Sequence, residues 1–157
     1  MEGRRAAAPH LALFPFPLQG HITPMLQLAH LLHSRGFSIT IVHARYNAPD
    51  HTKHPQFRFE PFADGIEPDQ FGAMGILEML STIVDSLKQP FRSVMGRIQS
   101  GQNRVDCVVS DALAYFSRAV AQELGLPWLV FRTSSPTSFM FFAAFPSLRQ
   151  MGYIPVQ

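Results

Sequence analysis

Only one cysteine, Cys107, occurs in the 157 residues, so the chain cannot form a disulfide framework of its own. Its neighbours in Val105–Val109 are mostly apolar, and we expect a small buried hydrophobe rather than a reactive thiol. Charged residues make up only 15% of the chain, and lysines and arginines form no run. This scarcity argues against a basic face that binds nucleic acid.

Long apolar runs are missing as well. No stretch approaches the roughly 18 uninterrupted apolar residues that a membrane-spanning helix needs. The apolar run that follows residues 1–9 is interrupted by Pro15 and Pro17, unlike a secretory signal. We therefore predict a flexible N-terminus over residues 1–9, no membrane anchor and a cytoplasmic location.

Several motifs that bind cofactors or present nucleophiles are also absent. No Gly-x-Gly-x-x-Gly follows the first apolar run and there is no Walker-type lysine loop, so a nucleotide-cofactor oxidoreductase loses its main support. No Gly-x-Ser-x-Gly element presents a serine nucleophile. His30 and His33 share a predicted helix without a carboxylate or cysteine, and His51 and His54 lie in a polar loop. We expect these four histidines to be solvated and predict neither a metal site nor a cofactor.

What the chain does contain is a regular alternation of strand and helix patterns. The predicted strands are residues 10–16, 37–43, 57–61, 105–110 and 128–132, and the predicted helices are residues 23–35, 76–99, 114–124 and 135–144. This order favours an α/β fold, a Rossmann-like parallel sheet flanked by helices and joined by right-handed crossovers. Pro61 indicates that the third strand lies near the sheet edge, and Pro90 is expected to kink or split the long helix.

Three polar residues follow predicted strands. His21 comes after the first strand, where a helix begins, Asp111 follows the fourth strand, and Thr133 follows the fifth. Ligands of such sheets bind beyond the carboxyl ends of the strands, and a doubly wound order makes the first and fourth strands neighbours. We therefore expect His21 and Asp111 to face each other across one crevice.

The chemistry of this pair is that of a general base and its partner. The partial positive charge at a helix start disfavours imidazolium, so His21 is expected to be neutral and able to accept a proton. A carboxylate bonded to one ring nitrogen would fix the tautomer and stabilise the imidazolium that forms. The proton would come from a substrate hydroxyl, since no serine or cysteine completes a triad.

Each assignment has a simpler structural alternative. His21 could only line a turn, and Asp111 or Thr133 could only cap the helix that follows. The phenylalanines of Phe139–Phe142 could line an acceptor pocket, but core packing is an equally good explanation. The joint position of the three polar residues at one sheet edge favours the functional interpretation.

Three segments resemble motifs of the plant family-1 UDP-glycosyltransferases. Phe14–Met25, which reads FPFPLQGHITPM, is similar to the N-terminal motif of that family, and Cys107–Ala112 and Phe131–Ser135 resemble two later motifs. The similarity extends over nearly the whole chain. In finer detail the sequence resembles the grass benzoxazinoid-type glucosyltransferases.

The resemblance implies a fold and a reaction. The fold would be the N-terminal, acceptor-binding half of a two-domain GT-B-type glycosyltransferase. The enzyme would move a sugar, expected to be glucose, from a UDP-sugar to a hydroxyl of a small aromatic or heterocyclic plant metabolite. The transfer would proceed with inversion and without a metal, and the UDP-sugar would be a co-substrate rather than a cofactor.

The resemblance also assigns roles to individual residues. His21 would deprotonate the acceptor hydroxyl and Asp111 would pair with His21. Thr133 and Gln19 would bind the donor. The predicted residues of the acceptor pocket are Phe16, Leu80 and Phe139.

The family's C-terminal signature elements have no counterpart in the chain, whose only tryptophan, Trp128, belongs to the fifth predicted strand. We therefore predict an incomplete N-terminal acceptor-binding domain over residues 10–157, an absent C-terminal donor-binding domain, and little activity of this chain alone. The alternative is a non-catalytic module that binds a small molecule or a protein partner.

Overall fold

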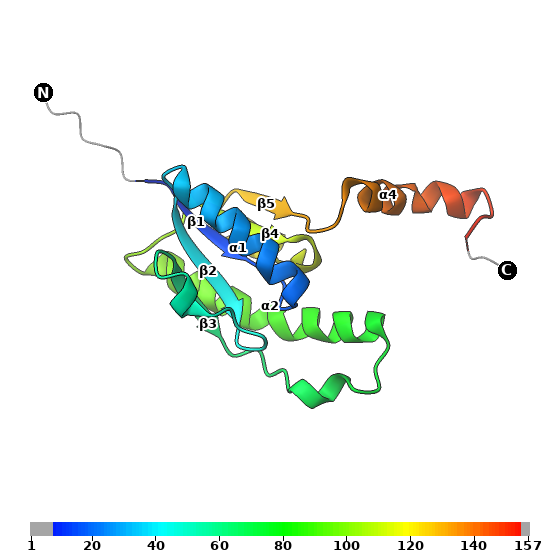
Figure 1. The fold of residues 1–157 in the computed structure, drawn as a ribbon, viewed down its shortest axis with the longest axis horizontal. Coiled ribbons are helices and arrows are strands. Elements are labelled where there is room, and N and C mark those ends of the chain that lie inside the picture. Colours follow the sequence, from blue (N-terminus) through cyan, green and yellow to red (C-terminus); the bar gives the residue numbers. More distant parts are fainter. Residues whose placement is uncertain (1–7, 155–157) are drawn as a thin grey trace, which may run out of the picture.

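A five-stranded parallel sheet with helices on both faces is the centre of the structure, a computed structural model that describes residues 8–154 (Figure 1). The strands are β1 His10–Phe14, β2 Ser38–Ala44, β3 Arg58–Phe62, β4 Cys107–Asp111 and β5 Trp128–Phe131. The helices are α1 Gln19–Ser34, α2 Ile76–Ser100, α3 Ser117–Glu123 and α4 Pro136–Gln150, with 3-10 turns η1 His51–Lys53, η2 Pro68–Phe71 and η3 Ala112–Ala114. Most of the predicted flexible N-terminus, and the last three residues of the predicted domain, lie outside the described residues.

The strand order confirms the predicted doubly wound sheet. The order is β3-β2-β1-β4-β5 and every pairing is parallel. β1 and β4 are neighbours, with Phe14 opposite Ser110, so the chain segments that leave these two strands begin side by side. β3, which contains Pro61, is an edge strand, as predicted from its proline.

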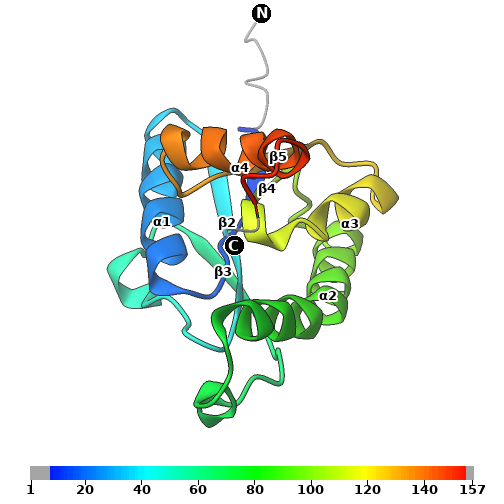
Figure 2. The ribbon, with the colours of Figure 1, turned by 90° about the vertical axis from the view of Figure 1, so that its right-hand side faces the viewer.

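Alternate residues along the strands fill two separate cores. Figure 2 shows α1 on one face of the sheet and α2 with α3 on the other. On the α1 side, Leu11 and Leu13 of β1 pack with Met25 of the helix. On the opposite side, Ala12 and Phe14 pack against α2 and α3. Because the helices cover the faces, only the edges of the sheet are left for ligands.

Two helix boundaries differ from the prediction. α1 begins four residues before the predicted Thr23, because the Leu18 carbonyl accepts hydrogen bonds from the N–H groups of His21 and Ile22. His21 therefore lies in the first turn of the helix. The predicted helix over residues 114–124 begins only at Ser117, since the side chain of Asp111 first closes the tight turn η3.

Two helices continue through an internal proline, at Pro90 and at Pro146. α2 continues from Ile76 to Ser100 through Pro90, so it is not split, and it changes direction along its length (Figure 2). α4 continues through Pro146 to Gln150, six residues beyond the predicted end. A proline removes only one backbone donor, and the neighbouring turns can keep the remaining hydrogen bonds of a helix.

α4 extends away from the rest of the molecule (Figure 1). Its N-cap is Ser135, whose hydroxyl accepts a hydrogen bond from the N–H of Ser138. The helix has no buried residue, and Phe139, Phe141 and Phe142 are each more than half exposed. The core-packing explanation for this aromatic segment is therefore wrong. Within residues 8–154, no helix combines the length and apolar character required to cross a membrane.

Candidate active site

His21 is held at the carboxyl edge of the sheet by the turn that follows β1. The turn is closed by hydrogen bonds to the carbonyls of Phe16 and Leu18, and α1 then begins at Gln19. The ring of Phe16 is fully buried and meets the imidazole edge-on, with 5.8 Å between ring centroids. Phe16 therefore supports one side of the His21 ring.

Asp111 is the last residue of β4, and its two carboxylate oxygens have different partners. Oδ1 accepts the N–H of Leu113 at 2.9 Å and so caps η3. Oδ2 lies 2.8 Å from Nδ1 of His21. Asp111 therefore caps the turn with one oxygen and faces His21 with the other. The predicted contact between His21 and Asp111 is confirmed, although 90 residues separate them in the sequence.

This contact sets the chemistry of the imidazole. The Asp111 side chain is only 1% exposed, and a carboxylate oxygen can only accept, so Nδ1 of His21 carries the hydrogen. In the neutral ring, Nε2 then has a free lone pair. The His21 side chain is 23% exposed, so a substrate can reach it. The arrangement is that of a general base held by a buried carboxylate.

Thr133, in the segment between β5 and α4, joins the same cluster. Its Oγ1 lies 3.2 Å from Nδ1 of His21, the nitrogen that also faces Asp111. All three polar residues predicted at the carboxyl edge are therefore in contact.

The other predicted site residues take no part in this hydrogen-bonded cluster. Gln19 is exposed in the first turn of α1, where its side-chain amide donates to Thr23 Oγ1 at 3.0 Å. Leu80 of α2 packs partly buried against the core. Phe139 lies on α4 beneath the guanidinium of Arg132, at 5.1 Å from the ring centroid. Phe16 has no exposed surface, so in this conformation it cannot touch an acceptor directly.

Three of the four histidines predicted to be solvated, His30, His51 and His54, lie within hydrogen-bonding distance of another histidine ring. His51 Nε2 lies 2.9 Å from Nε2 of the buried His43, and the His51 ring stacks on Phe59. His30 Nε2 lies 2.9 Å from Nδ1 of His54. His30, His33 and His51 are exposed, as predicted, and His54 is half-buried. The ring contacts themselves were not predicted, because they join the loop after β2 to a strand and to a helix. In the sequence, only the position of His43 within an apolar strand could have indicated a buried histidine that needs a hydrogen-bonding partner.

Neither a metal ion nor a thiol nucleophile fits the described residues. Residues 8–154 contain no group of three or more His, Cys, Asp or Glu side chains that could hold a metal. Cys107 is half-buried beside the core on the α1 side. Burial, followed by the nearby charge of Asp106, raises the pKa of the Cys107 thiol, which disfavours the reactive thiolate.

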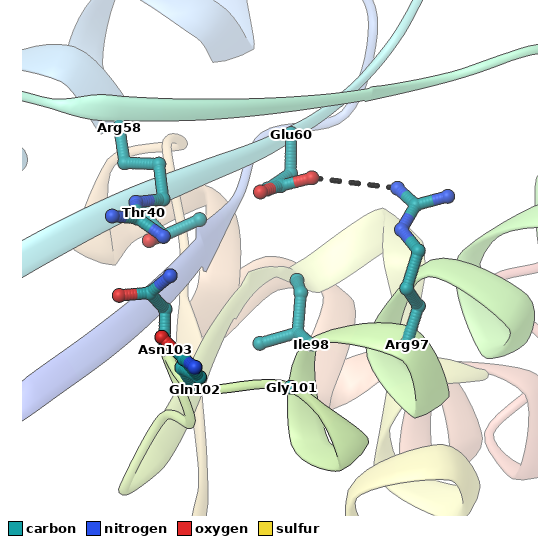
Figure 3. A pocket seen from close by; sticks show the side chains of 8 residues that line it. All are labelled: Thr40, Arg58, Glu60, Arg97, Ile98, Gly101, Gln102 and Asn103. Atoms are coloured by element: carbon teal, nitrogen blue, oxygen red, sulfur yellow. Dashed lines mark hydrogen bonds and ion pairs between the residues drawn. The ribbon is translucent and has the colours of Figure 1, made fainter.

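Two hollows flank opposite edges of the sheet. One, of about 210 Å³, lies near the amino ends of β2 and β3, where Glu60 forms an ion pair with Arg97 at 3.4 Å (Figure 3). It is at the wrong edge to serve His21. The other, of about 680 Å³, lies past the carboxyl ends of the same strands, between Arg45–Asn47 and Ala63–Glu67.

The carboxyl-edge hollow is connected to the turn that holds His21. The side-chain amide of Asn47 donates to the carbonyl of Pro17 at 3.4 Å, one residue before the helix cap Leu18. Ligands of doubly wound sheets bind at the carboxyl edge. This hollow is therefore the better candidate for a substrate pocket.

Comparison with known proteins supplies a family context for this geometry. The chain is 36% identical over 154 residues to UDP-glycosyltransferase 76B1 of Arabidopsis thaliana, a match that covers 98% of the chain and 34% of that protein. It is 36% identical over 141 residues to flavonol 3-O-glucosyltransferase UGT76E12 of the same plant, covering 88% of the chain and 31% of the relative. The chain thus spans about a third of the length of these curated relatives. No protein-family model matches the sequence.

Solved structures show the same fold. Phytolacca americana UGT2, complexed with UDP-2fluoro-glucose and pterostilbene, superposes with a TM-score of 0.75 at 20% identity, over 94% of this chain and 35% of that one. The five-stranded domain is that of the N-terminal domain of GT-B UDP-glycosyltransferase structures. In sequence and fold, the chain is therefore similar to the N-terminal portion of plant family-1 UDP-glycosyltransferases.

Proposed function

We propose that this chain is the acceptor-binding part of a plant UDP-glycosyltransferase, which moves a sugar from a UDP-sugar to a hydroxyl of a small metabolite. The observation that carries the proposal is the 2.8 Å contact between His21 Nδ1 and Asp111 Oδ2 at the open edge of the sheet. It leaves Nε2 as a base for a hydroxyl.

The proposed reaction is a direct displacement. Nε2 of His21 removes the proton of the acceptor hydroxyl, and the oxygen attacks the anomeric carbon of the donor sugar. The bond from that carbon to the UDP oxygen breaks as the new bond forms, so UDP leaves and the anomeric configuration is inverted. Asp111 stabilises the positive charge that His21 acquires.

The substrates are proposed by analogy and by chemistry. A flavonol is named for one relative and pterostilbene for one solved structure, so we propose a hydroxylated aromatic or heterocyclic acceptor and glucose as the sugar. Benzoxazinoids are the acceptors to test first, since they are predicted by the finer sequence resemblance. Gln19 and Thr133 are proposed donor contacts, and a cytoplasmic location remains a prediction.

A chimeric enzyme tests the function. Residues 10–157 would replace the aligned segment of UDP-glycosyltransferase 76B1, whose remaining two-thirds has no counterpart in this chain. We expect the chimera to transfer glucose from UDP-glucose to a panel of phenolic and benzoxazinoid acceptors. We expect the 157-residue chain alone to show little transfer, because orientation of the donor is lost.

The His21→Ala variant of the chimera tests the base. We expect kcat to fall about 10²- to 10⁴-fold, with little change in acceptor KM. His33→Ala is the matched control, since His33 is an exposed histidine on the same helix. A His21→Ala chimera as active as its parent would end the proposal that this residue is the base.

The alternative of a non-catalytic binding module has one observation in its favour. α4 exposes Phe139, Met140, Phe141 and Phe142, an apolar surface of a kind that often marks a protein interface. A well-folded chimera that binds acceptors but transfers no sugar to any of them would favour this alternative.

A further inference from the structure

The hydroxyl of Thr133 contacts the imidazole of His21, a contact that binding of the UDP-sugar alone would not require. Its Oγ1 lies 3.2 Å from Nδ1 of His21, while Oδ2 of Asp111 lies 2.8 Å from the same nitrogen. One ring nitrogen thus faces two oxygens that reach it from the ends of two neighbouring strands, β4 and β5. Three-centre hydrogen bonds of this kind are common in proteins.

The direction of each hydrogen bond follows from the donors and acceptors available. Asp111 Oδ2 can only accept, so the single hydrogen on Nδ1 belongs to the imidazole. Thr133 Oγ1 is then a second, longer acceptor for that hydrogen. A hydroxyl that accepts in this way directs its own hydrogen elsewhere. Among residues 8–154, the Thr133 hydroxyl makes no hydrogen bond except the one with His21.

We infer that Thr133 is a positioning residue for the general base. Together with Asp111 it holds the His21 ring on two sides of Nδ1, which keeps the Nδ1–H tautomer and aims Nε2 at the crevice. The buried ring of Phe16 supports the imidazole from a third direction, edge-on at 5.8 Å. Thr133 then offers its own O–H proton to an oxygen of the bound donor, so one hydroxyl connects the base with the donor side. The catalytic part of this inference depends on the proposed function.

Imidazole ¹⁵N spectroscopy of the 157-residue chain tests the inference without any catalysis. The spectra separate protonated from unprotonated ring nitrogens and therefore report the tautomer of His21. We compare the wild type with Thr133→Val, which keeps the shape but removes the acceptor, and with Thr133→Ser, which keeps the hydroxyl. Thr137→Val is the matched control, because Thr137 is exposed on α4 four residues away.

We expect His21 to be the Nδ1–H tautomer in the wild type, in Thr133→Ser and in Thr137→Val. In Thr133→Val the His21 signals should shift toward a tautomer mixture and the Nδ1–H should exchange faster with water. Thr133→Ala removes the same hydroxyl with less bulk and should give the same change. His21 signals that are unaltered in both hydroxyl-free variants would overturn the inference, whatever the chimera does.

Kinetics of the chimera supply the second measurement. Thr133→Val should lower kcat about fivefold, the rate equivalent of losing one neutral hydrogen bond of roughly 1 kcal/mol. Thr133→Ser should restore kcat, and acceptor KM should stay constant in both variants. A Thr133→Val effect confined to the KM for UDP-glucose would show donor binding alone and contradict the positioning role. An inactive parent chimera would count against the proposed function and leave the spectroscopic result standing.

Discussion

His21 and His43 are both hydrogen-bonded histidines, but they face different partners. His21, in the first turn of α1, places Nδ1 2.8 Å from a carboxylate oxygen of Asp111. His43, in β2, places Nε2 2.9 Å from Nε2 of His51. The first ring is partly exposed at the sheet edge, whereas the second is almost fully buried. The two sites therefore show how the hydrogen-bonding partner and the burial of a histidine affect its protonation.

The lowered pKa of His43 favours a neutral ring, and its hydrogen bonds fit one. Nδ1 lies 2.9 Å from the carbonyl of Ala44, which can only accept, so Nδ1 carries the hydrogen. In the neutral ring, Nε2 then accepts the N–H of His51. Burial lowers the pKa of His43, the hydrogen bond to Ala44 raises it to a smaller extent, and the charge of His51 lowers it further.

The difference lies in where an added proton would go. At His21 the new hydrogen would sit on the free Nε2 while the Asp111 carboxylate stabilises the positive charge. At His43 the new hydrogen would sit on Nε2, against the N–H of His51, inside a low-dielectric core. In the proposed function the edge site accepts a proton, whereas burial of the core site disfavours one.

After His21→Ala, the largest expected effect comes from removing the carboxylate of the edge site. In the chimera, Asp111→Asn keeps an oxygen to cap η3 but can present an N–H₂ group to Nδ1 of His21. That contact favours the opposite tautomer, in which Nε2 is protonated and cannot act as a base. We expect kcat to fall between about 10- and 10³-fold, less than in His21→Ala.

Asp64→Asn is the matched control for this variant. Asp64 is also buried and also accepts backbone N–H groups, from Tyr46 and Ile66, but it has no histidine partner. Because Asp64 also lines the carboxyl-edge hollow, we expect its variant to affect stability and acceptor KM more than kcat. Equal losses of kcat in the two variants would show that a buried carboxylate at this edge matters only for folding.

The sequence predicted the edge site because its residues follow strands. The alternation of strands and helices implied the doubly wound order, and that order brings the ends of β1 and β4 together. From there, the positions of His21, Asp111 and Thr133 after their strands were enough to place them at one edge. The contact of Thr133 with the imidazole itself was not foreseen, because it depends on side-chain directions that strand order does not set.

The core site could not be predicted in the same way. The contact between His43 and His51 depends on how the loop Arg45–Gln56 folds back onto β2, and no periodicity describes a loop of that length. The position of α4 was missed for a related reason. An aromatic helix is normally assigned to a core, but none of its residues is buried in this structure.

The free energy of unfolding of the 157-residue chain is expected to depend on pH, and chemical denaturation measures this dependence. The pKa of His43 is lowered in the folded state, mainly by burial, so the unfolded state binds the proton more readily. The stability contributed by the neutral ring is complete above the unfolded pKa of about 6.5 and is lost as the pH falls below it. We expect the free energy of unfolding to fall between about pH 7.5 and pH 5.

A His43→Phe variant identifies the source of this slope. Phenylalanine keeps a buried ring but cannot titrate, so the part of the slope due to His43 should vanish. His21→Phe is the control, since it removes a histidine from the edge site and should leave that part of the slope in place. A slope that is unchanged in His43→Phe would assign the pH dependence to other groups.

The smallest expected effect comes from the partner ring of the core site. His51→Ala removes the hydrogen bond to Nε2 of His43 and the stacking on Phe59, whose ring centroid lies 4.1 Å from that of His51. We expect the free energy of unfolding at pH 7.5 to fall by about 1–2 kcal/mol. His33→Ala, an exposed histidine that meets Phe57 edge-on at 5.8 Å, should change it by less than about 0.5 kcal/mol. Equal effects of the two variants, measured by urea titration, would mean that the imidazole pair adds nothing to an ordinary surface contact. A larger effect of His51→Ala would show that the buried acceptor on His43 requires its donor.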